Sequence, residues 1–129
     1  MVLIDSSVWI EVFRRRNPLD LEALVSIEDV ATCLPVIQEV LQGFGDEPAF
    51  RKARESMFSL TVVESPLEAA LIEEAIGLYR TARARGITIR SSADCLIAAC
   101  ALRHDLEVWH KDRDYAALAR VSRLRERGL

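Results

Sequence analysis

Four acidic residues stand where apolar segments of the chain begin or end, and their carboxylates are suited to binding a metal ion. They are Asp5, Glu39, Asp94 and Asp112. Crowded carboxylates repel one another strongly at low dielectric, so a fold tolerates such a cluster best when a divalent cation offsets the charge. Ligands that are all oxygen, without histidine or cysteine, indicate Mg²⁺ or Mn²⁺ rather than zinc. Sites of this kind commonly promote phosphodiester hydrolysis by a metal-activated water.

Each of these acids also has a purely structural interpretation. Asp5 could cap a helix, and Glu39 could be a solvated residue of an amphipathic helix. Asp94 could stabilise a helix N-terminus through the helix dipole. Asp112 and Asp114 lie in the charged segment KDRD, where a solvated turn is the simplest interpretation. The functional interpretation therefore depends on whether the fold brings the acids together.

The order of apolar and amphipathic segments predicts how the acids are positioned. Continuous apolar runs are typical of strands buried on both faces of a parallel sheet. The predicted strands are 1–4, 30–34, 60–63 and 106–109, with a fifth near 121–124. The predicted helices are 7–16, 19–27, 35–43, 46–58, 66–85, 93–103 and 115–119. Strands that alternate with helices indicate a three-layer α/β/α fold with a central, mostly parallel sheet of four or five strands.

In a parallel sheet the carboxyl ends of the strands and the N-termini of the following helices share one edge. Asp5, Asp94 and Asp112 map to this edge, and Glu39 lies one turn into a helix that begins there. The first helix is expected to be capped by Ser6 or Ser7, which would leave Asp5 free to bind a metal ion. Residues 65–68, SPLE, form a capping box that predicts the start of another helix.

Length and composition predict one domain that spans residues 1–129. Half of the residues are hydrophobic, but no apolar run approaches the roughly 18 residues of a membrane span. The pattern of the first residues does not predict a secretory signal, and the three cysteines lie in apolar segments, as expected for buried reduced thiols. These features predict a cytoplasmic protein without a membrane partner.

Three other classes of protein are alternatives to a nuclease. A phosphoryl-accepting receiver domain would need paired acids after the first strand and an acceptor aspartate after the third. Here a single acid, Asp5, follows the first strand, and the third ends in Glu64 and Ser65. A phosphatase with an aspartyl nucleophile needs a second acid at position 7, which is Ser7. A non-catalytic RNA-binding module that kept the fold stays open as an alternative.

A nuclease with an acidic centre needs cations that hold the phosphate backbone. The net charge of −3 does not itself indicate a nucleic-acid binder. Arg90 and Lys111 adjoin the predicted site in sequence and are the expected substrate contacts. Other candidates are the basic residues within 14–16, 51–54, 80–85 and 120–127. For 14–16 and 83–85, the helix dipole at a helix C-terminus is a sufficient explanation. His104 and His110 are expected at the surface.

Four segments in register resemble the PIN-domain ribonucleases of the VapC toxin type. They are LIDSSVWIE (3–11), PVIQEVLQG (35–43), SADCLIAACALRHDLEV (92–108) and HKDRDY (110–115). The resemblance implies a metal-dependent endoribonuclease in which Asp5, Glu39, Asp94 and Asp112 form the acidic catalytic and metal-binding site. It gives Ser6 a role in orienting water or phosphate, and Asp114 a supporting role. The expected products carry a 3′-hydroxyl and a 5′-phosphate, and the choice of Glu39 or Asp112 as the group that positions the water stays open.

The resemblance also implies partners. They are an RNA substrate, a second copy of the chain in a homodimer, and a small VapB-like antitoxin whose tail crosses the acidic site. DNA would be contacted only indirectly, through the antitoxin. The chain departs from the family at two positions: Tyr115 replaces a common phenylalanine, and His110 replaces the usual threonine or serine.

Overall fold

A sheet of five parallel strands forms the centre of the molecule, which a computed structural model describes over residues 1–129. The strands are β1 (Val2–Ile4), β2 (Val30–Cys33), β3 (Thr61–Val63), β4 (Glu107–His110) and β5 (Glu126–Gly128). Their order is β3-β2-β1-β4-β5, and Leu3 of the central strand pairs with Ala31 on one side and Val108 on the other. The predicted α/β fold with a parallel sheet is confirmed.

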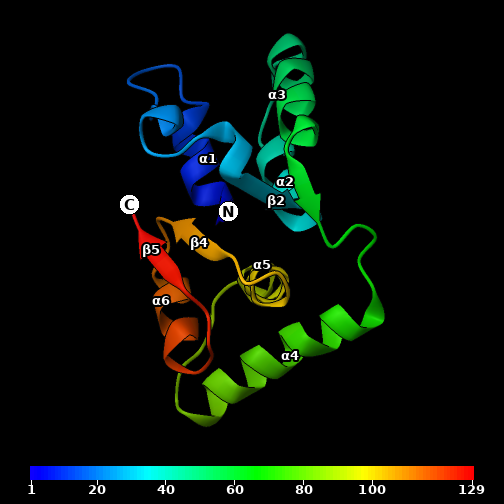
Figure 1. Cartoon of the computed structure of the whole chain (residues 1–129), viewed down its shortest axis with the longest axis vertical. Helices are drawn as coiled ribbons and strands as arrows, with labels where there is room; N and C mark the ends of the chain where they lie inside the picture. The colour runs from blue at the N-terminus through cyan, green and yellow to red at the C-terminus, as the bar shows by residue number, and fades with distance from the viewer.

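Helices cover both faces of this sheet (Figure 1). They are α1 (Ser6–Val12), α2 (Leu34–Leu41), α3 (Glu47–Ser59), α4 (Ala69–Ala84), α5 (Ser92–Arg103) and α6 (Arg113–Arg120). Helices α1, α2 and α3 lie on one face, and α4, α5 and α6 on the other (Figure 1). The chain moves outward from β1 through β2 to β3, then crosses to β4 on the opposite side. The reversal lies between β1 and β4, which is where open α/β sheets form their binding crevice.

Three segments differ most from the sequence-based predictions. Helix α1 ends at Val12 rather than at residue 16, because Phe13 leaves helical geometry and packs on Trp9 and Phe44. Residues 19–27 do not form an α-helix; the structure has only two short 3₁₀ turns, Leu21–Ala23 and Ile27–Asp29. The fifth strand is 126–128 instead of 121–124. It is a polar edge strand, so no apolar run marks it.

The helix caps are also partly different from the prediction. Asp5, not Ser6 or Ser7, is the N-cap of α1, and its carboxylate accepts the Ser7 N–H at 3.0 Å. The capping box at 65–68 does not form, because α4 begins at Ala69 with the extended residue Glu68 before it. The proline expected in the first turn of α2 is there.

The hydrophobic core lies on both sides of the sheet, and α5 is its most buried helix, as predicted from its apolar sequence. All three cysteines are buried free thiols, which confirms that prediction. None of the helices combines the length and the apolar character that crossing a membrane requires.

Candidate metal centre

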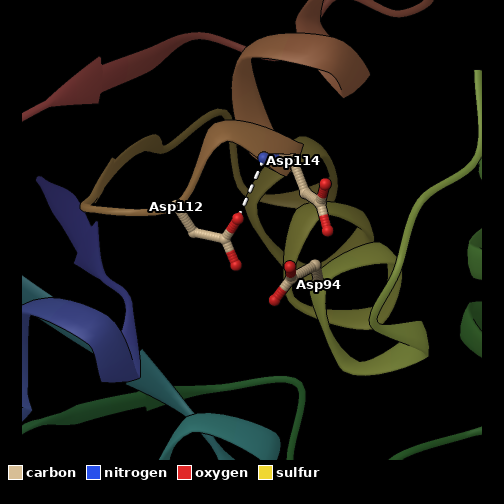
Figure 2. Close-up of side chains that lie close together, drawn as sticks. All are labelled: Asp94, Asp112 and Asp114. Atoms are coloured by element: carbon tan, nitrogen blue, oxygen red, sulfur yellow. Dashed lines mark hydrogen bonds between the residues drawn. The ribbon is translucent and has the colours of Figure 1, made fainter.

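Three aspartates converge at the carboxyl edge of the sheet and are called here the aspartate trio: Asp94, Asp112 and Asp114 (Figure 2). One carboxylate oxygen from each lies within 4.8 Å of the others. Asp94 comes from the first turn of α5, whereas Asp112 and Asp114 lie at the start of α6. The trio contains two of the predicted metal ligands, Asp94 and Asp112. Its third member, Asp114, was expected to have only a supporting role. Asp5 and Glu39 lie outside it.

Local backbone geometry positions two members of the trio. Asp112 is the N-cap of α6, and its Oδ1 accepts the N–H of Asp114 at 3.0 Å (Figure 2). This arrangement is a common way to begin a helix, and it places the side chain of Asp114 one half-turn away on the same helix end. The charged segment KDRD is therefore a helix start rather than a solvated turn, and Asp114 is buried.

Asp94 is the most electrostatically perturbed of the acids. It is 4% exposed, and its Oδ2 is buried without any hydrogen-bond partner. The pKa of the Asp94 carboxyl is raised from 3.8 to about 8; burial is the main cause, and the neighbouring Asp112, Asp5 and Asp114 contribute to the same increase. Buried polar atoms in proteins are nearly always paired. A bound cation would supply a partner for this oxygen, which belongs to a carboxylate beside two other acids.

Asp5 lies beside the trio and is tied to it by a tyrosine. Its Oδ2 accepts hydrogen bonds from the Ser7 N–H and the Ser7 hydroxyl. Its Oδ1 accepts the Tyr115 hydroxyl at 2.6 Å, and the same hydroxyl lies 3.3 Å from Oδ1 of Asp94. The buried Asp5 carboxylate therefore serves as a helix cap and as one end of a bridge to Asp94.

Glu39 and Ser6 form a hydrogen-bonded pair between α2 and the start of α1. The Ser6 hydroxyl donates to Glu39 Oε1 at 3.2 Å. Burial raises the pKa of Glu39, and the charges of Asp5 and Asp112 add to the increase, while the hydrogen bond from Ser6 opposes it. The hydrogen bond to Ser6, the residue that follows Asp5, places the Glu39 carboxylate near the start of α1.

The two predicted substrate cations lie differently. The Arg90 guanidinium is 3.8 Å from Asp114 Oδ1 and 4.0 Å from Asp112 Oδ1, so it borders the aspartate trio. The backbone N–H of Arg90 also donates to Asp114 Oδ2 at 3.2 Å. By contrast, the Lys111 ammonium pairs with Glu11 of α1 at 3.5 Å. Only Arg90 directs its charge to the acids in this structure.

His110 and Tyr115 are the residues of the site that sequence reasoning missed. His110 is buried, not at the surface as expected, because β5 brings Glu126 against its Nε2. Its Nδ1 accepts the N–H of Asp112 at 3.2 Å, which requires the proton of the neutral ring to be on Nε2. The ring packs on Tyr115 with 5.1 Å between centroids. The signal that could have found them was the departure of both positions from the family pattern.

Glu64 is the acid at the position where a receiver domain would need its phosphoryl-accepting aspartate, and it is not part of the acidic site. Glu64, just after β3, pairs with Arg103 and His104 at the end of α5. Its carboxylate is therefore engaged in a link between the β3–α4 loop and α5, and no phosphoryl acceptor stands at the carboxyl end of β3.

The donor set fits a hard divalent cation. The three carboxylates of the trio offer oxygen atoms close enough to share one ion, and Asp94 Oδ2 lacks any other partner. Oxygen ligands of this kind are typical of Mg²⁺ and Mn²⁺ sites. An apolar groove of about 690 Å³ begins beside this centre, at Glu39, and runs between α2, α4 and α5.

Comparisons with known proteins agree with this geometry. Residues 2–121 match the PIN domain family. Ribonuclease VapC11 of Mycobacterium tuberculosis is 36% identical over 129 residues, which cover 96% of each chain. Among solved structures, VapBC2 from Rickettsia felis bound to a promoter DNA fragment has a TM-score of 0.75 at 15% identity, covering 100% of this chain and 99% of that chain. A toxin–antitoxin complex from Klebsiella pneumoniae has a TM-score of 0.72 at 19% identity, covering 90% and 91%. The chain belongs to the PIN domain family and, within it, to the VapC ribonucleases.

Proposed function

We propose that this VapC ribonuclease is a Mg²⁺- or Mn²⁺-dependent endoribonuclease and acts as the toxin of a toxin–antitoxin pair. The observation that carries the proposal is the buried, unpaired Oδ2 of Asp94 beside two other carboxylates. Asp94, Asp112 and Asp114 would hold the cation, and Asp5 would complete the negative field from the end of β1. When bound, the cation would neutralise charge on the scissile phosphate and favour ionisation of an attacking water.

Glu39 is the better placed of the two acids considered for positioning that water. Asp112 Oδ1 already accepts the Asp114 N–H, and Arg90 is next to it. Glu39 receives one hydrogen bond, from Ser6 to Oε1, so Oε2 is available to a water molecule. The raised pKa of Glu39 also brings this carboxylate closer to the range of an effective proton acceptor at neutral pH. Ser6 would then hold Glu39 in place rather than contact phosphate itself.

Arg90 would bind a phosphate of the RNA next to the scissile bond. The Arg90 guanidinium is largely exposed. The Asp114 carboxylate pairs with this guanidinium and also accepts the backbone N–H of Arg90. Lys111 would reach phosphate only by leaving Glu11. Arg90 is therefore the main candidate for substrate contact.

Arg90→Gln should raise KM for RNA by about tenfold and reduce the salt dependence of binding by about one counterion, because one phosphate contact is lost. Arg51→Gln is the matched control: Arg51 pairs only with Glu47 along α3 and the charge change is the same. The measurement is cleavage kinetics with RNA binding at several salt concentrations. Equal salt slopes for both variants would remove Arg90 from the substrate site.

Removal of divalent metal tests the proposed chemistry directly. Cleavage of a labelled RNA by the purified chain should fall to background in EDTA, and added Mg²⁺ or Mn²⁺ should restore it, since the acidic centre repels phosphate without a cation. Cleavage that persists in chelator would contradict the metal dependence. RNA binding without cleavage in the presence of either metal would favour the non-catalytic alternative.

The antitoxin would occupy the apolar groove between α2, α4 and α5. Leu67, Ile72 and Ile76 line this groove and are partly exposed, at 36%, 40% and 52%. The groove also includes Glu39, so an amphipathic helix lying in it could direct a basic side chain toward the acids. The complexes solved for structural neighbours support such a partner.

Growth arrest on expression of the chain alone, relieved by the protein encoded next to it, would test the toxin role. A homodimer, and DNA contact through the antitoxin alone, stay predictions.

A further inference from the structure

We propose that the hydroxyl of Tyr115 is a positioning group that bridges Asp5 and Asp94 and orients the Asp94 carboxylate for the cation. The inference rests on the proposed metal-dependent function, and it assigns a role to a residue where the family commonly has phenylalanine. It concerns the arrangement of the ligands before the cation arrives, not the chemistry of cleavage.

One phenolic oxygen lies between the two carboxylates. It is 2.6 Å from Asp5 Oδ1 and 3.3 Å from Asp94 Oδ1, and all three groups are buried. A phenol has a single hydrogen, so the short contact with Asp5 takes most of it and the longer contact with Asp94 is the weaker one. Phenylalanine at this position would leave both Oδ1 atoms facing an apolar ring edge.

The position of the hydroxyl is set by tight packing rather than by a mobile side chain. Tyr115 is fully buried in the first turn of α6, and its ring packs on His110. His110 is itself held at both nitrogens, by the Asp112 N–H and by Glu126. The hydroxyl therefore joins three elements, the end of β1, the start of α5 and the start of α6, at one fixed point.

This bridge decides which oxygen atoms remain for a cation. Asp5 has both oxygens occupied, Oδ2 by Ser7 and Oδ1 by Tyr115. Asp94 has its Oδ1 turned to Tyr115, which leaves Oδ2 as the buried atom without a partner. In Figure 2 the Asp94 carboxylate is directed to the side on which Asp112 lies. Groups that orient metal ligands in this way commonly contribute tenfold to a hundredfold to metal affinity.

Mn²⁺ binding to the full chain, measured by calorimetry, tests the assignment with the variant Tyr115→Phe. The Kd for Mn²⁺ should rise about tenfold. Tyr79→Phe is the matched control, because it removes the same hydroxyl from the other tyrosine, on α4, and should leave the Kd unchanged. If the Kd of Tyr115→Phe for Mn²⁺ is within twofold of the wild-type value, the inference is overturned. A loss of thermal stability in EDTA with an unchanged Kd would mean that the hydroxyl has only a structural role.

The same experiment separates this inference from the function it rests on. If the wild-type chain binds no Mn²⁺, both the proposed metal-dependent function and the role of Tyr115 are overturned. If the wild type binds Mn²⁺ and cleaves RNA while Tyr115→Phe behaves as wild type, only the proposed role of Tyr115 is overturned. Should Tyr115→Phe not fold, wild-type protein labelled with 3-fluorotyrosine supplies the measurement, because its two tyrosines give two ¹⁹F signals that Tyr79→Phe assigns. The Tyr115 signal should shift as Mg²⁺ saturates the site while the Tyr79 signal does not, and an unmoved Tyr115 signal would overturn the proposal.

Discussion

Replacing Asp94 with asparagine is expected to reduce RNA cleavage by at least about a thousandfold and, at the same time, to make the metal-free protein more stable at neutral pH. The loss of activity follows from the proposed role of the Asp94 carboxylate as a buried cation ligand, because a weakened metal site forfeits several kcal/mol of transition-state stabilisation. Asparagine has nearly the same shape, so it keeps the packing of α5. The loss of activity and the gain in stability have the same cause, because both follow from removing a carboxylate that is costly to ionise in a buried site.

The gain in stability should depend on pH in a definite direction. The folded chain raises the pKa of Asp94 to about 8 from 3.8, chiefly through burial and then through Asp112. Between these pH values the unfolded chain releases the proton while the folded chain keeps it, so rising pH favours the unfolded state. The contribution of Asp94 to stability is therefore present below pH 4 and is lost progressively as pH rises to 8. Asparagine carries no charge at any pH and avoids this loss.

Thermal unfolding in EDTA at pH 5, 6, 7 and 8 measures the effect. The difference in Tm between Asp94→Asn and wild type should grow with pH and reach at least about 4 °C at pH 8, which is roughly 1 kcal/mol for a domain of this size. Asp20→Asn, a change of the same charge at an exposed position, should show no such trend. An Asp94→Asn variant that is less stable than wild type at pH 8, or that cleaves within tenfold of it, would contradict the assignment.

The main features of the fold could be predicted because the buried strands are marked by apolar runs. Residues 1–4 and 106–109 read as strands covered on both faces, and the acids that follow them had to meet at one edge. The strand at 126–128 could not be predicted in this way. It is polar and lies at the sheet edge, and only its backbone pairing with β4 identifies it as a strand.

This one missed strand explains the misplaced histidine. Glu126 of β5 lies against His110, so the ring is buried under the start of α6, and Tyr115 packs on it in turn. No short-range pattern in the segment HKDRDY indicates that a residue sixteen positions later closes over it. The direction in which Arg90 points was likewise decided by a distant residue, Asp114.

The misassigned cap of α1 also has a tertiary cause. Serine and aspartate are about equally good N-caps, so local propensity could not choose between Asp5 and the serines that follow it. In the structure the Ser7 hydroxyl donates to Asp5 and accepts the N–H of Lys111, which comes from the loop after β4. This contact across the sheet edge occupies Ser7 and leaves the cap to Asp5. Asp5 thus has a structural role as well as the proposed catalytic one.

The double role of Asp5 predicts that its two simplest variants behave differently. Asp5→Ala should lose cleavage by at least about a hundredfold, and it should also destabilise the protein by about 2 kcal/mol, because it removes the cap of α1 and leaves the buried Tyr115 hydroxyl without its acceptor. Asp5→Asn should lose cleavage to a similar extent with a much smaller loss of stability. Its side-chain oxygen can still cap the helix, and its amide group can donate to the Tyr115 oxygen.

Urea denaturation in EDTA, together with cleavage rates at saturating Mg²⁺, measures both roles of Asp5. Asp46→Ala is the matched control for the cap, since Asp46 caps α3 by accepting the Ala49 N–H at 2.9 Å at an exposed site. It should cost about 1 kcal/mol of stability without changing cleavage. If Asp5→Asn cleaves RNA as fast as the wild type, Asp5 is only a helix cap and the metal centre consists of the aspartate trio alone. If it is inactive while Asp46→Ala is active, the loss cannot come from a weakened helix end, and the charge of Asp5 itself is required.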